Sequence, residues 1–467
     1  MKIISARSHH SLTRVLNAAE RSLERIASWY ERVCSIKEIR EQLILQWAFG
    51  ASLFYFFVSF SLWIERATTS VETAQAGGAI CWPYFQNCSW TYFLHTFPYG
   101  YSQTLFYMFL YAIMVAIVYF MWKKEWSKAH VLLSTLLLWK LFVIFVQSFV
   151  QAGPYDYYHI FLTLILLYVP CKEFFLKLAF VFFYFMSVTV KFTPGWVLGT
   201  YFTSMRSGLP VFPDSMVPLL TNFVIFVQIV DCWFLMSKNR LFQRASLIFG
   251  IIFHLYSGVL VSYNYPSAAL PPLLILFGPL YRYTEIPFGR KTIAGWVVIG
   301  LVAAFQLLGF VVSPDRFLTM EGHRYGMFMF EANHQCTATI RTYSTGTSAN
   351  RSWSGMNCTG LYCLVATSNT SKDGMSVYTT TYESASAWNR CDPYEVWTRA
   401  KARCGNPSIV RISMQFDHSI NGGPFYRIVD ESSICDLTYK PFSHNDWIKL
   451  PPEAPIVGYP VKNFYSL

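Results

Sequence analysis

Apolar and polar positions along this chain separate into long blocks. A charged segment of 46 residues comes first, then a run of apolar stretches, and then a mostly polar segment of about 150 residues. The apolar stretches lie at 47–64, 101–122, 129–151, 157–170, 173–190, 216–236, 242–262, 267–281 and 292–313. A helix needs about 20 apolar residues to cross a bilayer, so the pattern predicts nine membrane segments, of which the short fourth and eighth are tilted or re-entrant.

The charged segment, residues 1–46, spaces its apolar residues as one face of a helix does. Leu16, Leu23, Ile26 and Tyr30 alternate with Lys, Arg and Glu. We expect an amphipathic helix on the cytoplasmic membrane surface, with a solvated targeting tail as the alternative. The first apolar stretch begins behind this tail, so the sequence indicates no removable signal peptide.

The C-terminal segment, residues 314–467, has the two-residue alternation of strands. It is clearest at Thr337–Tyr343, Ser376–Tyr382 and Val410–Phe416, with Gly and Asn turns between them. The sequence therefore predicts an α-helical polytopic bundle at 47–313, followed by a β-rich domain at 314–467.

Basic residues mark alternate loops of the predicted bundle. They fall in the N-terminal tail and at Lys123, Lys124, Lys128, Lys172, Lys177, Lys238, Arg240, Arg244, Arg282, Arg290 and Lys291. Loops enriched in Lys and Arg face the cytoplasm. The N-terminus is then cytoplasmic, and residues 314–467 are extracellular or, in a eukaryote, in the lumen of the endoplasmic reticulum. Because the net charge of +11 is a topology signal of this kind, we expect the lipid bilayer, not nucleic acid, as partner.

Cysteines and glycosylation sequons agree with that orientation. Three cysteines, Cys34, Cys171 and Cys232, fall on the cytoplasmic side or in the membrane. Eight fall outside and are disulfide candidates, with a zinc site as the weaker alternative: Cys81, Cys88, Cys336, Cys358, Cys363, Cys391, Cys404 and Cys435. We expect Cys81 or Cys88 to bond to the C-terminal domain, or the two to bond to each other. The candidate glycosylation sites also fall outside: Asn87, Asn350, Asn357 and Asn369.

The stretch Val190–Thr200, V-K-F-T-P-G-W-V-L-G-T, places Lys191 at the end of the fifth apolar stretch. Charge is costly at a membrane segment, and Pro194 and Gly195 end the helix directly afterwards. Trp196 adds a ring of the kind found at membrane interfaces. Lys191 is either a lysine that extends its amine to the interface or a base with a lowered pKa.

Further polar residues fall at the same predicted level of the bundle and predict a substrate pocket there. They are His159, His254, Tyr263, Asn264, Gln147 and Gln151. Polar groups within a bundle usually line a cavity. The alternative for each histidine is a hydrogen-bonded residue of the core. Lys140 and Asp231 lie deeper and are expected to form a buried ion pair. The sequence has no Walker, G-x-S-x-G, H-E-x-x-H or G-x-G-x-x-G motif, and we expect no bound metal.

Several of these stretches together resemble the vitamin K-dependent γ-glutamyl carboxylase family and its wider relatives, the horizontally transferred transmembrane domain proteins. The similarity covers roughly residues 45–445 and is carried by D-Y-Y-H-I-F at Asp156–Phe161, V-K-F-T-P-G-W-V-L-G at Val190–Gly199, the motifs within Phe253–Arg282 and F-L-T-M-E-G-H-R-Y-G-M-F-M-F at Phe317–Phe330.

The resemblance implies a lyase that couples oxidation of a reduced naphthoquinone by O2, giving the epoxide, to carboxylation of glutamate by CO2. Lys191 would deprotonate the reduced quinone and His159 would assist the oxygenated intermediate. The partners implied are a lipid quinone and a Glu-containing protein substrate.

Two features depart from the family pattern. The C-terminal domain is short, and Asn333-His334-Gln335-Cys336 stands where a more His-rich run is expected. The alternatives are therefore the same scaffold acting on another lipid or quinone without protein carboxylation, and a non-catalytic membrane subunit.

Overall fold

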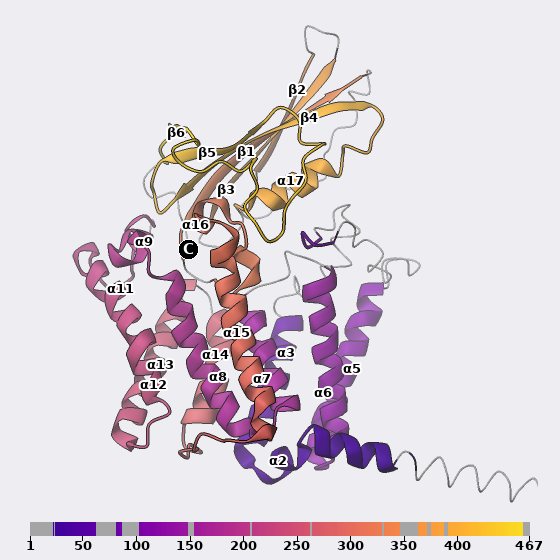
Figure 1. Cartoon of the computed structure of the whole chain (residues 1–467), viewed down its shortest axis with the longest axis vertical. Helices are drawn as coiled ribbons and strands as arrows, with labels where there is room; N and C mark the ends of the chain where they lie inside the picture. The colour runs from indigo at the N-terminus through magenta and orange to yellow at the C-terminus, as the bar shows by residue number, and fades with distance from the viewer. Residues whose placement is uncertain are drawn as a thin grey trace, which may run out of the picture.

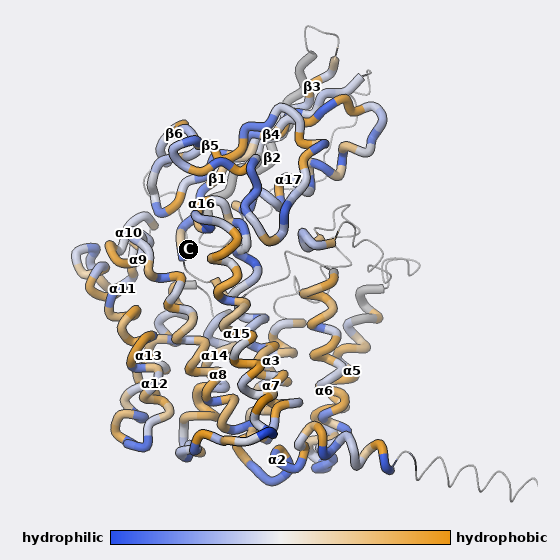
Figure 2. Tube along the Cα trace, in the orientation of Figure 1, coloured by the Kyte–Doolittle hydropathy of each residue, from blue (hydrophilic) through white to orange (hydrophobic). Residues whose placement is uncertain are grey.

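The computed structural model describes residues 22, 24–61, 81–85, 102–147, 154–205, 208–261, 264–328, 331–345, 363–370, 375–386 and 391–460. A helical bundle and a sheet domain, residues 331–460, stack along the long axis of the molecule (Figure 1). Apolar residues dominate the bundle helices, whereas polar residues gather at the far end of the bundle and over the sheet domain (Figure 2).

Each predicted apolar stretch overlaps a helix. The bundle comprises α3 (Leu43–Ser61), α5 (Ser102–Trp122), α6 (Trp126–Phe142), α7 (Pro154–Tyr168), α8 (Lys172–Ser187), α11 (Val217–Phe226), α12 (Cys232–Phe234), α13 (Arg240–Val261), α14 (Asn264–Phe277) and α15 (Ile293–Val312). The described chain also has two π-helical segments. The segment η5 (Val143–Gln147) extends α6, and η9 (Val227–Asp231) joins α11 to α12. The apolar blocks thus correctly predict where the helices lie.

Six helical segments of the described chain are long and apolar enough to cross a membrane. They are Leu43–Phe60, Trp126–Val146, Lys172–Val190, Asp214–Phe234, Arg240–Leu260 and Arg290–Val312. Tyr107–Trp122 and Tyr265–Phe277 are shorter apolar helices. The structure therefore fits an integral membrane protein, and the count of nine crossings stays a prediction.

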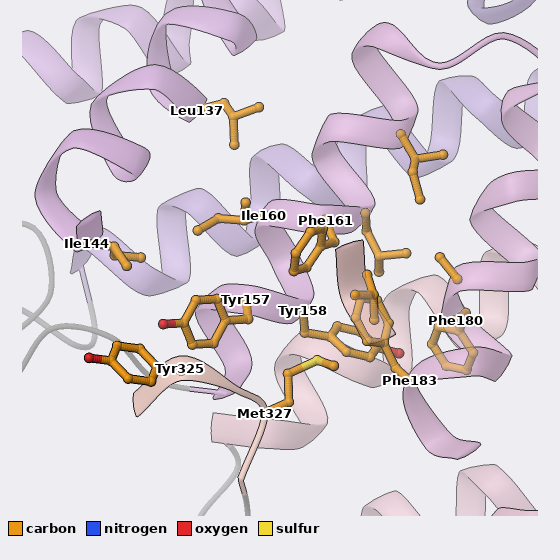
Figure 3. Close-up of a cluster of buried hydrophobic side chains, with 14 of the residues drawn as sticks. Leu137, Ile144, Tyr157, Tyr158, Ile160, Phe161, Phe180, Phe183, Tyr325 and Met327 are labelled. Atoms are coloured by element: carbon orange, nitrogen blue, oxygen red, sulfur yellow. The ribbon is translucent and has the colours of Figure 1, made fainter. Parts of the chain in front are cut away.

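Helix α7 lies inside the bundle, and its described part has 15 residues. The side chains from Tyr155 to Phe161 are all buried. Tyr158 packs on Phe183 of α8 with ring centroids 4.5 Å apart, and Met327 from the chain leading to the sheet domain lies beside them (Figure 3). The Tyr157 hydroxyl donates to the Arg324 carbonyl at 2.5 Å. This central helix thus packs both in the bundle core and against the segment that leads to the sheet domain.

The described end of the predicted amphipathic tail packs against the bundle. Helix α2 (Ile36–Glu41) buries Ile36 and Ile39 in the main core cluster. The Glu38 carboxylate accepts from the backbone N–H groups of Cys171 and Lys172, at 3.0 and 2.9 Å. It therefore caps the N-terminus of α8, whose first N–H groups have no partner within the helix.

The sheet domain is one antiparallel sheet in the order β2-β3-β1-β4-β5-β6. Its strands are β1 (His334–Ser344), β2 (Cys363–Thr370), β3 (Ser376–Ser386), β4 (Ile409–Ile420), β5 (Phe425–Glu431) and β6 (Ile456–Gly458). Burial alternates along β1, which fits the period of two in the sequence. The helix α17 (Pro393–Lys401), which the sequence analysis does not predict, lies beside the sheet (Figure 1).

Disulfides confirm part of the cysteine assignment. Cys336 bonds Cys391, and Cys404 bonds Cys435, while Cys34, Cys171 and Cys232 are free as expected. Cys81 is also disulfide-bonded, but its partner is not among the described side chains, so the choice between its two predicted arrangements stays open. Further predicted positions lie outside the described residues or side chains: Cys88, Cys358, Cys363, Asn87, Asn350, Asn357 and Asn369.

Candidate active site

Lys191 lies where α8 ends beneath the sheet domain. A 3-10 turn, Val188–Val190, continues α8, and Lys191 follows it directly. The chain then turns into the short helix α9 (Pro194–Val197), with Pro194 in its first turn and the Thr193 side chain accepting from the backbone N–H of Trp196. The predicted helix end at Pro194 is therefore a turn that folds Trp196 back over Lys191.

The Lys191 side chain is buried, with 2 % of its surface exposed, and this excludes a lysine that extends to the interface. Its amine donates to the Ser187 carbonyl at 3.1 Å and lies 5.3 Å from the centroid of the Trp196 ring. Tyr201 of α10 (Thr200–Thr203) stacks on Trp196, with centroids 5.5 Å apart. Among the described residues no carboxylate lies within ion-pair distance of the amine.

Burial lowers the pKa of Lys191 to about 7, and Glu331 acts in the opposite direction. The loss of water disfavours the ammonium form, and a neighbouring carbonyl and ring do not fully replace that water. An ordinary lysine has a pKa of about 10.4 and is almost entirely protonated at neutral pH. About half of Lys191 is then neutral at pH 7, which suits a general base.

The sheet domain fixes the loop that follows Lys191. Asn333 donates through its side-chain amide to the Tyr201 carbonyl and, at 3.0 Å, to the Ser204 hydroxyl. Its backbone N–H in turn donates to the Asn421 side chain at 2.9 Å. A Cβ at Gly195 would lie 2.2 Å from the Asn421 amide nitrogen, so any larger residue here would displace the Asn421 side chain. Contacts between the α9–α10 loop and the sheet domain therefore fix the position of Lys191.

Four buried side chains of the sheet domain and its linker form a second polar group near Lys191. Glu331 Oε1 lies 3.4 Å from His323 Nδ1 and 3.7 Å from His334 Nε2. His334 Nδ1 lies 3.1 Å from His418 Nε2, and His418 Nδ1 lies 2.5 Å from the Leu318 carbonyl oxygen. These contacts make a continuous chain from Glu331 to the backbone.

The donors along this chain follow from its last member. Because the Leu318 carbonyl only accepts, His418 Nδ1 donates, which leaves His418 Nε2 to accept from His334 Nδ1. His334 Nε2 and Glu331 Oε1 then face each other without a proton between them, and neither has a hydrogen-bond partner. At neutral pH the group therefore presents the Glu331 carboxylate near Lys191, with Oε1 left to accept a hydrogen bond.

The pKa values in this group leave Glu331 negatively charged at neutral pH. Burial acts to raise the Glu331 pKa, but His323 and His334 outweigh it, and the pKa lies below its ordinary value. Burial lowers the pKa of His323 to about 4 and that of His418 to about 3, so both are neutral at pH 7. Glu331 is thus the anion that acts on Lys191.

His159 belongs to a different buried network. Its Nδ1 lies 3.2 Å from the Lys140 amine and its Nε2 lies 3.1 Å from the Ser52 carbonyl. Since the lysine donates and the carbonyl accepts, His159 carries its proton on Nε2. Lys140 pairs with Asp156 at 2.9 Å, so the predicted pair with Asp231 is wrong. Asp231 instead accepts from the Ser246 hydroxyl at 2.9 Å.

His254 is buried within α13 and contacts neither Lys191 nor His159 among the described interactions. Its Nε2 is bonded to the Tyr184 hydroxyl, and its ring lies 4.9 Å from the Tyr265 ring. Tyr265 packs with Tyr155 and Tyr55 in one cluster, and the Tyr55 ring lies 4.6 Å from that of His159. A tyrosine layer therefore separates His159 from His254.

The predicted site residues thus fall into three groups. Lys191 and Trp196 are together, whereas His159 and His254 each have their own partners. Tyr263 and the side chains of Asn264, Gln147 and Gln151 lie outside the described part of the chain.

The sequence analysis did not assign a site role to four residues of this region: Tyr201, Glu331, His334 and His418. The run Glu331-Ala-Asn-His334, which leads into β1, is a signal for polar side chains at the domain junction. No described group of three or more His, Cys, Asp or Glu side chains is arranged to hold a metal ion.

No family model, curated protein or solved structure matches this chain. The geometry of the described residues is therefore the basis for assigning a function. The main features of the site are a buried lysine with a lowered pKa, the stacked rings of Trp196 and Tyr201 beside it, and a buried carboxylate–histidine group in the adjoining domain.

Proposed function

We propose that this chain is an integral membrane enzyme of the vitamin K-dependent γ-glutamyl carboxylase type, in which Lys191 is the general base that deprotonates a reduced naphthoquinone. One observation carries the proposal. The Lys191 amine is buried at the junction of bundle and sheet domain, its one described hydrogen-bond partner is a carbonyl, and its pKa is about 7.

Lys191 has the properties that proton removal from a phenolic hydroxyl demands. A phenol has a pKa of about 10, so transfer to a base of pKa about 7 is uphill by three units, or about 4 kcal/mol. The buried ammonium formed in that step attracts the phenolate strongly, because little water screens the pair. Glu331 raises the proton affinity of Lys191 and so reduces the uphill step.

The surrounding polar atoms fit a ligand with hydroxyl groups. The Tyr201 hydroxyl, Glu331 Oε1 and the Asn333 side-chain oxygen are buried without a hydrogen-bond partner. Unpaired buried polar atoms are costly, and a ligand that bonds to them removes the cost. The reduced naphthoquinone, when bound, supplies the reducing power for reaction with O2 and the strong base that glutamate carboxylation by CO2 requires.

The chain's own residues would then hold the proton and exclude water. Lys191 accepts the hydroxyl proton, and the negative charge of Glu331 stabilises the ammonium form that results. Trp196 and Tyr201 cover the amine, so reactive species form away from bulk water. In this proposal His159 belongs to a separate buried network, because Lys140 and Ser52 engage both of its ring nitrogens.

One observation favours a second candidate, a non-catalytic membrane subunit. The crevice described below is lined from α8, α11, η9, α12, α13 and α14, and Lys191 is not among its lining residues. A bundle filled around Lys191 would leave no room for a quinone unless the junction opened. Oxidation of a quinone without protein carboxylation is the intermediate case, and it shares the Lys191 chemistry.

An assay of the purified full-length protein in nanodiscs separates these cases. We expect it to convert reduced vitamin K to the epoxide under O2 and to transfer label from ¹⁴C-bicarbonate to a Glu-containing peptide. Epoxide without label would indicate quinone oxidation alone. The absence of both products would support the non-catalytic subunit, provided that the protein is folded by circular dichroism and elutes as a single species.

For orientation, we propose a cytoplasmic N-terminus and a sheet domain in the lumen of the endoplasmic reticulum, where Glu-containing substrates and oxidised cysteines would both lie. The two sheet-domain disulfides support an oxidising compartment, since such bonds are rare in the cytosol. Protease added to sealed microsomes should leave residues 314–467 intact. Their digestion without detergent would overturn the orientation.

The pH profile of turnover gives a specific prediction for Glu331. A base must be neutral, so activity should rise with pH through the Lys191 pKa of about 7. Glu331→Gln removes the charge that raises this pKa, and the rising limb should move to lower pH. Glu321→Gln is the matched control, because Glu321 is also buried but bonds to His444 and Asn445 instead. An unchanged limb in Glu331→Gln would disprove the coupling.

A further inference from the structure

The bundle contains a crevice whose lining residues do not include Lys191. Tyr184 of α8 lines one side, and the rest of the wall comes from α11, η9, α12, α13 and α14. The enclosed part of the crevice is small, about 20 Å3, which is room for one hydroxyl group, and the rest of it is open to the surroundings. Its apolar lining residues are Val224, Val227, Leu235, Phe249, Phe253 and Leu273. The crevice therefore offers an apolar wall to a molecule that enters from the bilayer.

Two polar side chains of the crevice, Gln228 and Asp231, have oxygen atoms that can accept further hydrogen bonds. Gln228 is 4 % exposed, and its side-chain oxygen has no hydrogen-bond partner. One turn along, Asp231 accepts from the Ser246 hydroxyl, and this single bond leaves acceptor positions on the carboxylate. Gln228 and Asp231 both line the space. A bound molecule that donates hydrogen bonds would satisfy them.

The backbone at this place is itself unusual. Gln228 and Asp231 belong to η9, a π-helical turn inside an otherwise α-helical membrane-length segment. A π-turn inserts one residue and changes the direction of the side chains that follow, and such turns occur frequently at functional sites. The turn and the unpaired amide oxygen are independent observations, and both point to this crevice.

We propose that the crevice receives the hydroxyl group of a membrane lipid with an apolar body, and that this hydroxyl donates to the Gln228 side-chain oxygen or to the Asp231 carboxylate. A metal ion is a poor occupant, because Asp231 is the only carboxylate among the lining residues and oxygen-binding cations need several ligands. A lipid is a good one, because only 28 % of the Asp214–Phe234 and Arg240–Leu260 segments is buried inside the protein, so their outer faces are available to the bilayer.

Two lipids share this chemistry: a sterol-type alcohol of the bilayer, and the reduced quinone of the proposed function held before it reaches Lys191. Val224 connects the two places, because it lines the crevice and packs against the cluster that contains Trp196 and Tyr201. Binding at the crevice does not depend on Lys191 being a base, so its failure and the failure of the proposed function are separate results.

The test uses the full chain in nanodiscs and a fatty alcohol that carries a diazirine and an alkyne. The matched control probe is its methyl ether, which accepts but cannot donate. After irradiation and digestion, we expect the alcohol to label peptides from residues 217–260 about five-fold more than the ether, as the loss of one hydrogen bond implies. Excess cholesterol or excess reduced vitamin K should compete, and the better competitor identifies the natural class.

Gln228→Leu should reduce labelling by the alcohol to that of the ether. It removes an unpaired buried amide oxygen, so the thermal midpoint should be unchanged or higher. The control is Phe226→Leu, since Phe226 is 55 % exposed on the same helix and does not line the crevice. Equal labelling by alcohol and ether in the wild-type protein, or full labelling of Gln228→Leu, would overturn the proposal.

Discussion

Lys191→Met should reduce the rate of quinone epoxidation by about 100- to 10,000-fold, the usual contribution of a general base. Methionine keeps most of the side-chain volume and removes a buried amine, so we expect folding and expression to be retained. The measurement is epoxide formation by equal amounts of folded protein. A small primary amine added to Lys191→Ala, which leaves space for it, should restore part of the activity.

The Arg variant distinguishes a base from a positive charge. Guanidinium stays protonated at any usable pH, so Lys191→Arg should be as inactive as Lys191→Met. Lys401→Arg is a suitable control, because Lys401 lies on α17 against Trp397, away from the site. Full activity of Lys191→Arg would mean that the site needs only a cation.

Asp156→Asn should lower the free energy of unfolding by about 3–5 kcal/mol, the usual cost of leaving one member of a buried ion pair without its partner. Lys140 and Asp156 are 3 % and 1 % exposed in their side chains and lie 2.9 Å apart. The same ammonium bonds to His159, so the histidine should also lose its fixed orientation. Thermal unfolding in a mild detergent measures the effect as a lower midpoint.

A double variant separates the loss of the pair from the loss of a single charge. Lys140→Met with Asp156→Asn leaves no uncompensated charge and should recover much of the stability lost in Asp156→Asn. The exposed pair Lys440–Asp446 provides the comparison, because Asp446→Asn should change the midpoint little. A double variant no more stable than Asp156→Asn alone would show that the ion pair is not the cause.

Helix positions could be predicted from the sequence because apolar side chains are contiguous there. The limit of this signal is clear at α7. Its 15 described residues are too few to span a bilayer, yet they form the centre of the bundle, since tyrosines and isoleucines pack equally well against lipid or protein. Strand alternation likewise predicted β1, β3 and β4, but gave no information on the sheet order.

Individual site residues were less predictable than the elements that hold them. Lys191 was identifiable as a lysine at the end of an apolar stretch, but its burial depends on Asn333 and Asn421, more than a hundred residues later. The Lys140 partner was misassigned although Asp156 and His159 are three residues apart on α7 and so share a face. Glu331 could not be linked to Lys191 because their approach is purely tertiary.

The proposed mechanism requires Lys191 to be partly neutral at pH 7, and the titration of its amine tests this requirement most directly. Biosynthetic incorporation of lysine labelled with ¹³C at the ε-carbon gives each lysine a resonance whose shift follows the protonation of its amine. We predict one resonance with a midpoint near 7 that is missing from Lys191→Arg, while exposed lysines titrate at about 10. A Lys191 resonance that titrates with the exposed lysines would contradict the proposed mechanism.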